Sequence, residues 1–356
     1  MTMRPLATPR LAAPLIGVAA IVVAAGLWWS PERTWPTLLV CTVYLLFVAL
    51  GGALFLSTQH LSHAGWSRPL WRVAEAITSA LPVAAVLMLS MAAGWPWLYP
   101  WAHGGAEPMG ADKARYLSPI AVFVRSALVL GAWALLARAL RRHERRVFYS
   151  ALFVVVFAPS FLVASVDWIM SLSPHWASTI FVVYLFAGVM MSGLVVLTLI
   201  VLILQTRDVS SAHLHDLGTL IFAFSTFWAY IWLSQYLLIW YSNLPDEVTH
   251  YVRRTHGAWA WLFFLNPIVN WVVPFVVLLP WAAKHHPRTL AAICLLLLGG
   301  RWLDVYLLIA PEARIAPAIG PIEVLVPLGY AGLFVVCFSR ALQGAPVAYA
   351  DAPPHV

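Results

Sequence analysis

Residues 177–204 read ASTIFVVYLFAGVMMSGLVVLTLIVLIL, an apolar run that contains no charged side chain. A helix of roughly 20 such residues is long enough to cross the hydrocarbon core of a bilayer, which is about 30 Å thick. Similar runs recur along the whole chain. We therefore predict ten transmembrane helices, at residues 12–29, 36–56, 75–94, 118–138, 147–170, 177–204, 215–240, 257–281, 289–309 and 320–341.

The composition of the chain predicts the same fold class. Of the 356 residues, 62% are hydrophobic and only 10% are charged, whereas soluble domains carry about 25% charged residues. A transmembrane β-barrel would show short segments of alternating hydrophobicity, and the sequence has long continuous ones instead. We expect an all-α integral membrane protein with about ten spans in residues 1–342, followed by a short cytoplasmic tail at 343–356.

The basic residues predict the orientation of the chain. With a cytoplasmic N-terminus, thirteen Lys and Arg residues fall in loops on the cytoplasmic side and six fall on the outer side. Cytoplasmic loops are typically enriched in these residues, so both termini are predicted to be cytoplasmic. The net charge of +7 then reflects membrane topology, and no nucleic-acid partner is expected. The run at 12–29 lacks a clear signal-peptide cleavage site, and we interpret it as a retained helix.

Charged side chains inside a membrane are costly and are often functional. The deepest acidic residue is Asp304, which follows Arg301 by three positions in the segment GGRWLDVYLL. Residues at this spacing share one face of a helix and can form an ion pair. The sequence leaves two interpretations open: a buried ion pair that holds helices together, or a functional pair.

Further polar residues lie near the predicted span ends, in two groups at different depths. The outer group contains Asp167, His175, Arg125 and Glu323, and the inner group contains His60, Glu75 and Asp216. Glu75 and Asp216 are predicted at helix N-termini, where the helix dipole favours a negative charge. Asp167 and His175, in the segment DWIMSLSPHWAST, either end two helices or handle protons.

The seventh predicted span carries a polar stripe through an apolar helix. Its members are Asp216, Thr219, Thr226, Tyr230 and Ser234, at helical spacing. Hydroxyl groups both donate and accept hydrogen bonds, so the stripe could conduct protons together with water. Hydroxyl side chains also hold membrane helices together, and the sequence does not decide between the two roles.

Histidine and cysteine positions bear on cofactors. The histidines fall in loops or near span ends, which disfavours a haem held by two histidines in the middle of the membrane, and no C-x-x-C motif occurs. We expect no cofactor and no metal in this chain. Outside the spans, Pro245 followed by two acidic residues predicts a short interfacial helix within 241–256.

Four stretches carry a family resemblance. They are HAGWSRPLWRVAEAI at 63–77, DWIMSLSPHWASTIFVVYLFAG at 167–188, HDLGTLIFAFSTFWAYIWLSQYLLIWYSNLP at 215–245 and GRWLDVYLL at 300–308. Together, over about residues 45–310, the chain resembles the F subunit (ActF) family of bacterial alternative complex III, a quinol:electron-acceptor oxidoreductase. This family groups with NrfD/PsrC-like membrane proteins, whose core is two four-helix bundles flanked by extra helices.

The resemblance implies a cofactor-free, non-catalytic subunit in the bacterial inner membrane that contributes a proton pathway through half-channels. The implied partners are an NrfD-like quinol-binding subunit, an iron–sulfur protein, multihaem and monohaem cytochromes c and, in some assemblies, a terminal oxidase. These partners would carry haem c and iron–sulfur clusters, with quinol as the substrate of the complex. The family motifs match this chain at Asp167, His175, Asp216, Tyr230, Ser234, Gln235, Arg301 and Asp304.

Two other functions stay open at this point. The outer polar residues could form a quinol site, with Asp167 or His175 taking the proton. Alternatively, the chain could be a purely structural anchor for redox subunits.

Overall fold

The computed structural model describes residues 9–103, 110–141, 145–205, 208–313 and 316–343, and these residues form helices and no strand. Ten helical segments are long and apolar enough to cross a membrane, which confirms the predicted fold class. The helices are α1 (Pro9–Trp29), α2 (Pro31–Leu61), α3 (Arg68–Thr78), α4 (Leu81–Ser90), α5 (Trp95–Leu98), α6 (Ala111–Tyr116), α7 (Pro119–Ala139), α8 (Arg146–Trp168), α9 (Phe181–Leu204), α10 (Ser211–Ser242), α11 (Pro245–Thr255), α12 (Ala260–Pro267), α13 (Val273–Leu278), α14 (Trp281–His285), α15 (Pro287–Ile309) and α16 (Pro321–Gln343).

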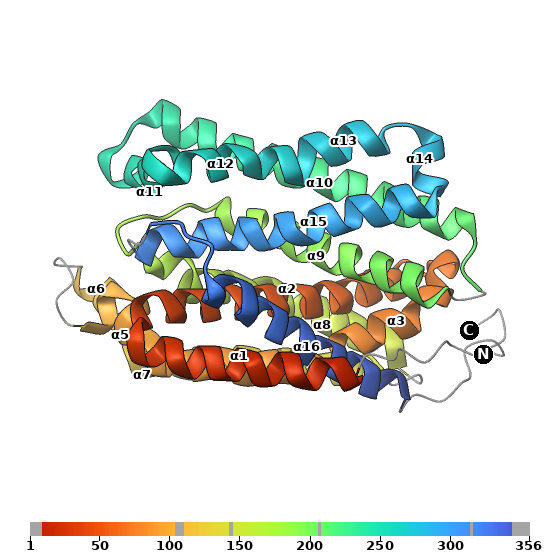
Figure 1. The fold of residues 1–356 in the computed structure, drawn as a ribbon, viewed down its shortest axis with the longest axis horizontal. Helices are drawn as coiled ribbons and strands as arrows, with labels where there is room; N and C mark the ends of the chain where they lie inside the picture. Colours follow the sequence, from red (N-terminus) through yellow and green to blue (C-terminus); the bar gives the residue numbers. More distant parts are fainter. Residues whose placement is uncertain (1–8, 104–109, 142–144, 206–207, 314–315, 344–356) are drawn as a thin grey trace.

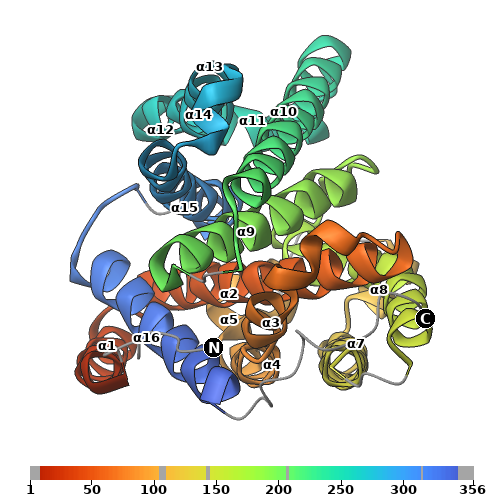
Figure 2. The ribbon, with the colours of Figure 1, turned by 90° about the vertical axis from the view of Figure 1, so that its right-hand side faces the viewer.

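The long helices form two four-helix bundles with two flanking helices (Figures 1 and 2). Bundle one contains α2, α7, α8 and the span made by α3 and α4, while bundle two contains α9, α10, α15 and the span made by α12 and α13. Helices α1 and α16 pack on each other and cover α2 from outside. This arrangement agrees with the architecture that the family resemblance implies.

The two ends of the bundles differ. Helix α1 begins and α16 ends at one end, which also carries α3 and α14 and which we call the terminal end. The opposite end carries the short helices α5, α6 and α11 (Figure 1) and is called the far end. Helix α11 is the short helix that the sequence predicted after Pro245, with Asp246 and Glu247 in its first turn.

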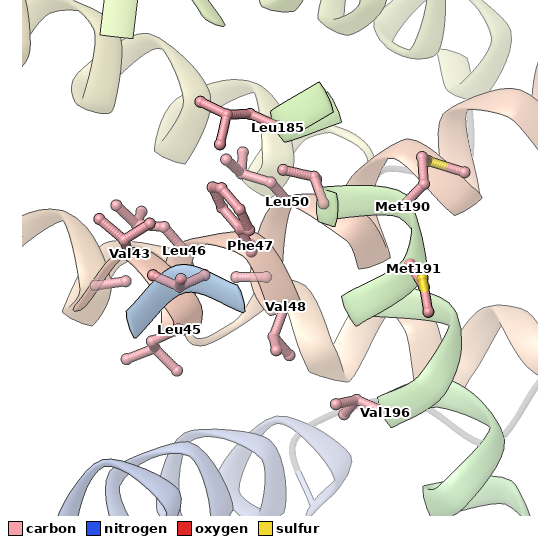
Figure 3. Close-up of a cluster of buried hydrophobic side chains, with 14 of the residues drawn as sticks. Val43, Leu45, Leu46, Phe47, Val48, Leu50, Leu185, Met190, Met191 and Val196 are labelled. Carbon is pink, nitrogen blue, oxygen red and sulfur yellow. The ribbon is translucent and has the colours of Figure 1, made fainter. Parts of the chain in front are cut away.

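The bundles join where α2 crosses α9. These two helices are the most buried spans: 94% of the most apolar window of α2 lies inside the protein, compared with 17% for α1. At the crossing, a Cβ atom added to Gly193 would lie 2.5 Å from the backbone carbon of Gly51. Small residues allow such close approach of membrane helices. Apolar side chains including Phe47, Leu50, Leu185 and Met191 line this interface (Figure 3).

Aromatic side chains fill the interior of bundle one. Phe153, Phe157 and Phe161 stack along one face of α8, with neighbouring ring centroids 5.8 and 4.8 Å apart. Trp133 of α7 lies against Phe157 at 5.6 Å and against Trp168 at 5.8 Å. The indole N–H of Trp133 donates to Ser160 at 2.8 Å. Aromatic rings and one indole–hydroxyl hydrogen bond therefore connect α7 to α8 in this bundle.

Three helix starts differ from the predicted ones. The third span begins with the amphipathic helix α3 at Arg68, so Glu75 lies two turns inside a helix and not at its N-terminus. Helix α10 begins at Ser211, which places Asp216 beyond the first turn. His175 lies in the loop before α9 and not in the helix. Helices α3 and α10 begin before the apolar runs because their first turns are polar and lower the local hydrophobicity, whereas α9 begins at Phe181, later than predicted.

The eighth span is interrupted. Pro267 ends α12, a π-helical turn follows at Ile268–Val272, and α13 continues toward the terminal end. Proline removes a backbone donor and disturbs the helix, and π-turns occur frequently at functional sites. The predicted tail at 343–356 lies outside the described residues, apart from the last residue of α16.

The α2–α9 crossing yields a first prediction. Gly193→Ala places a methyl group against the Gly51 backbone, so we expect the free energy of unfolding to fall by about 3 kcal/mol or more. Thermal unfolding of the full chain in detergent, followed by size-exclusion chromatography, measures the loss. Gly131→Ala in α7 is the matched control because nothing lies within 4 Å of its added Cβ. Equal unfolding temperatures for the two variants would contradict the proposed importance of the crossing.

Candidate functional site

Asp304 is the centre of a buried polar cluster in bundle two. Its carboxylate accepts a hydrogen bond from Arg301 Nη2 at 2.6 Å, one from Asn266 Nδ2 at 2.8 Å and a short one from the Tyr184 hydroxyl. Arg301 and Asp304 are each 1% exposed. The predicted pairing is therefore present, and two further helices supply donors to it.

The guanidinium of Arg301 is enclosed by groups from four helices. Its Nη1 lies 3.4 Å from Asn270 Oδ1, and its Cζ lies 5.2 Å above the ring of Trp228. A Cβ added to Gly188 would lie 2.6 Å from Nη2, so the glycine makes room for the charge. The Nε atom has no hydrogen-bond partner. A cation beside an aromatic face gains electrostatic stabilisation when it is desolvated.

The π-helical turn orients two asparagines toward this pair. Asn270 donates to Asn266 Oδ1 at 2.7 Å and to the backbone oxygen of Gly300 at 3.0 Å. The chain of contacts therefore runs from Asn270 through Asn266 to Asp304. Every member is buried, and a satisfied network of this kind is rigid in a medium of low dielectric constant.

A small cavity lies on the far-end side of Asp304. Its volume is about 20 Å³, and a space of roughly 10–15 Å³ is enough for one water molecule. Polar groups of Tyr184, Gln235, His250 and Asp304 line it, together with Arg254. Gln235 and Asp304, which the sequence marked separately, thus share one cavity.

A much larger vestibule opens at the far end. It has a volume of about 860 Å³ and lies between α5, the loop before α9, and α11. His175, Asp246, His250, Arg253 and Glu312 are among its ionisable lining residues. His175 is exposed there, whereas Asp167 is buried in a different place. Asp167 and His175, which are close together in the segment DWIMSLSPHWAST, therefore belong to two different sites.

Glu312 ties the vestibule wall to the end of α15. Its carboxylate accepts from Arg253 at 2.5 Å, from Arg254 at 2.8 Å and, by a short hydrogen bond, from Ser173. Arg254 also donates to the backbone oxygens of Leu307 and Leu308, at 2.8 and 3.0 Å. These oxygens belong to the last turn of α15, where a cation is favoured by the helix dipole.

His250 stands between the cavity and the vestibule. Its ring stacks on Trp176 with the centroids 3.9 Å apart and the planes 6° from parallel. Nδ1 lies 3.2 Å from Glu312 Oε1, but its direction does not satisfy a hydrogen bond. Burial, followed by the charge of Arg254, lowers the pKa of His250 to about 4, although Glu312 acts in the opposite direction. The imidazole is neutral at pH 7.

Asp167 forms a separate site with Arg125 at the edge of bundle one. Arg125 Nε and Nη2 donate to the two carboxylate oxygens at 2.8 and 2.9 Å. Nη2 also donates to the backbone oxygen of Tyr116, and the guanidinium lies 4.0 Å from the centroid of that ring. The bidentate geometry is strong and anchors α7 to α8.

The polar stripe of α10 does not form a path inside this chain. Thr219 and Tyr230 are exposed, and Asp216, Thr226 and Ser234 are only partly buried. Thr219 donates to His215 O and Thr226 to Phe222 O, within the same helix. Tertiary packing turned this face of α10 away from the bundle interior, which helical spacing alone could not predict.

The remaining predicted residues lie at separate places. His60 Nδ1 is 3.0 Å from Ser150 Oγ, and Glu323 pairs with Arg33 at 2.6 Å. Asp216 lies 3.5 Å from His215. Burial lowers the pKa of Arg141 at the terminal end, and the nearby carboxylate of Glu75 partly counteracts it. None of these four predicted residues, His60, Glu75, Asp216 and Glu323, lines the cavity beside Asp304.

Sequence reasoning missed several members of the site: Tyr184, Asn266, Asn270, His250, Arg254 and Glu312. One signal was available, because two asparagines four residues apart flank a proline in an apolar span. The contacts of Tyr184 and Glu312 join residues more than 100 positions apart, and a single sequence does not reveal such pairs.

The chain matches no protein-family model and no curated protein.

The lowered pKa of His250 gives a testable pH dependence. The unfolded chain takes up a proton at His250 below about pH 6.5, whereas the folded chain does so only near pH 4. Stability should therefore fall as the pH decreases through this window, by at most about 3 kcal/mol. Thermal unfolding between pH 4 and pH 7 measures the effect. In His250→Gln this part of the pH dependence should be absent, and an unchanged profile would contradict the prediction.

Proposed function

We propose that this chain is a membrane subunit of a quinol-oxidising respiratory complex and that bundle two provides a proton half-path from the outer side to Asp304. The single observation that carries the proposal is the position of Asp304. Its carboxylate is buried among Arg301, Tyr184 and Asn266, yet it lines a water-sized cavity directly beneath the far-end vestibule.

The bias of basic residues supports the direction of the path. The loops predicted on the cytoplasmic side contain thirteen Lys and Arg residues, compared with six on the other side. We therefore assign the far end to the outer side of the inner membrane and the terminal end to the cytoplasm. Asp304 precedes the last residue of α15 by five positions, or about 8 Å along the helix.

Size favours protons over a quinol at Asp304. A cavity of about 20 Å³ accommodates one water molecule and no quinone ring. Water in contact with a tyrosine hydroxyl and a carboxylate can pass protons between them. On the terminal side of Asn270, no hydrogen bond between described side chains joins two helices of bundle two. The side-chain hydrogen bonds that join described residues of these helices are therefore confined to the part of bundle two between Asn270 and the far end. This is the distribution expected of a half-path.

The assignment to a quinol-oxidising complex is supported by the four quoted motifs, which resemble the F subunit family of alternative complex III. Under this proposal the haem c groups, the iron–sulfur clusters and the quinol site belong to partner subunits. Bundle one, with its aromatic interior, and the flanking helices would then contact partners and lipid.

A second candidate is a quinol site in the vestibule. Its volume of about 860 Å³ is within the usual range for small-molecule sites, and Trp97, Tyr99, Trp176 and His175 line it. A photoreactive quinone that labels these residues, and is displaced by free quinol, would support this function. Labelling confined to partner subunits would exclude it.

Replacement of Asp304 tests the proton half-path. In Asp304→Asn we expect the assembled complex, reconstituted in vesicles, to translocate fewer protons per electron, because the titratable group at the end of the path is gone. A pH indicator and the rate of quinol oxidation give the two quantities.

The double variant Arg301→Gln/Asp304→Asn controls for an uncompensated buried charge, which by itself costs about 3–5 kcal/mol. It should assemble better than the single variant and be equally defective in proton translocation. Full proton translocation in an assembled double variant would favour the purely structural anchor.

A further inference from the structure

The cavity and the vestibule have one lining residue in common among the described residues, and it is His250. The side chain is 7% exposed, and the residue lies between the two spaces. Any water-borne exchange between the vestibule and Asp304 that follows these two spaces passes His250.

The other polar groups of the wall are poor proton carriers. Arg254 faces the cavity, but a guanidinium does not release its proton in proteins. Glu312 faces the vestibule, and its oxygens are occupied by Arg253, Arg254 and Ser173. His250, in contrast, carries an imidazole that can both take up and release a proton, and its buried Nδ1 lies 3.2 Å from Glu312 Oε1 without a well-directed hydrogen bond.

The surroundings of His250 suit a transient positive charge. Arg253 and Arg254 disfavour a permanent imidazolium, whereas Glu312 lies 3.2 Å from Nδ1 and can stabilise a short-lived one. The stacked Trp176 fixes the plane of the ring, so the two nitrogens keep fixed directions. Histidine is the side chain best suited to exchange protons near neutral pH.

We propose that His250 is the proton relay between the vestibule and the Asp304 cavity. The neutral imidazole takes one proton from vestibule water at one nitrogen and releases one proton from the other nitrogen to water in the cavity. That water passes a proton to the carboxylate of Asp304. Only N–H and O–H bonds form and break. The transfer leaves the imidazole neutral in its other tautomer, and water-assisted exchange of a proton between its two nitrogens restores the starting tautomer before the next transfer. The relay rests on the proposed half-path to Asp304.

The test follows the protonation of Asp304 in the full-length chain in lipid nanodiscs. A rapid pH jump is recorded by time-resolved infrared spectroscopy, and subtraction of the Asp304→Asn spectrum isolates the signal of Asp304 and its partners. In His250→Gln we expect the rate of this signal to fall about 100-fold, in the range for loss of a proton-transfer group, while its final amplitude is retained. Thr249→Ser, which also changes the vestibule wall, should keep the wild-type rate.

Chemical rescue distinguishes a relay from a structural residue. In His250→Ala, imidazole added to the vestibule should restore the rate, and a series of substituted imidazoles should give rates that follow their pKa values. A wild-type rate in His250→Gln overturns the relay and leaves the half-path intact. If the wild-type chain has no Asp304-dependent signal, both the half-path and the relay are wrong. Rescue that does not depend on the pKa of the added imidazole overturns the relay in favour of a packing role.

Discussion

The close approach of two helix backbones at Gly51 and Gly193 sets the geometry of the whole molecule. Because the backbones of α2 and α9 touch at these two glycines, the apolar side chains around them form one interior that the two bundles share. Dispersion forces, and not the hydrophobic effect, drive helix association in lipid, so the contact depends on fit. The relation between bundle one and the Arg301–Asp304 cluster follows from this crossing, since Gly188 lies one and a half turns along α9 from Gly193 and makes room for Arg301.

The interiors of the two bundles contain different kinds of side chain. In bundle one, Phe153, Phe157, Phe161 and Trp133 fill the space where a polar path would have to run. In bundle two, the broken helix α12–α13 introduces the buried side chains of Asn266 and Asn270. A buried ion pair is weak support for stability by itself. The extra donors around Asp304 show why this pair can persist, and the adjoining cavity is large enough for one water molecule.

Much of the fold could be predicted from the sequence because apolar runs of membrane length are long and unambiguous. The pairing of Arg301 with Asp304 was also predictable, since both lie on one helix face. The partners of that pair were not, because Tyr184 and Asn266 reach Asp304 from other helices and their sequence distances carry no signal. The sequence left the role of the stripe on α10 open, and the structure shows that its members are exposed or half-buried and that Thr219 and Thr226 donate to backbone oxygens of their own helix.

Arg254 joins two helices. This residue of α11 donates to the backbone oxygen of His250 in its own helix and to those of Leu307 and Leu308 in α15. It also pairs with Glu312, which follows the end of α15. One guanidinium therefore joins α11 to the last turn of α15, about one turn of helix from Asp304. A displacement of α11 has to break these hydrogen bonds or carry the end of α15 with it, so the positions of the surface helix and of the buried carboxylate are linked through one side chain.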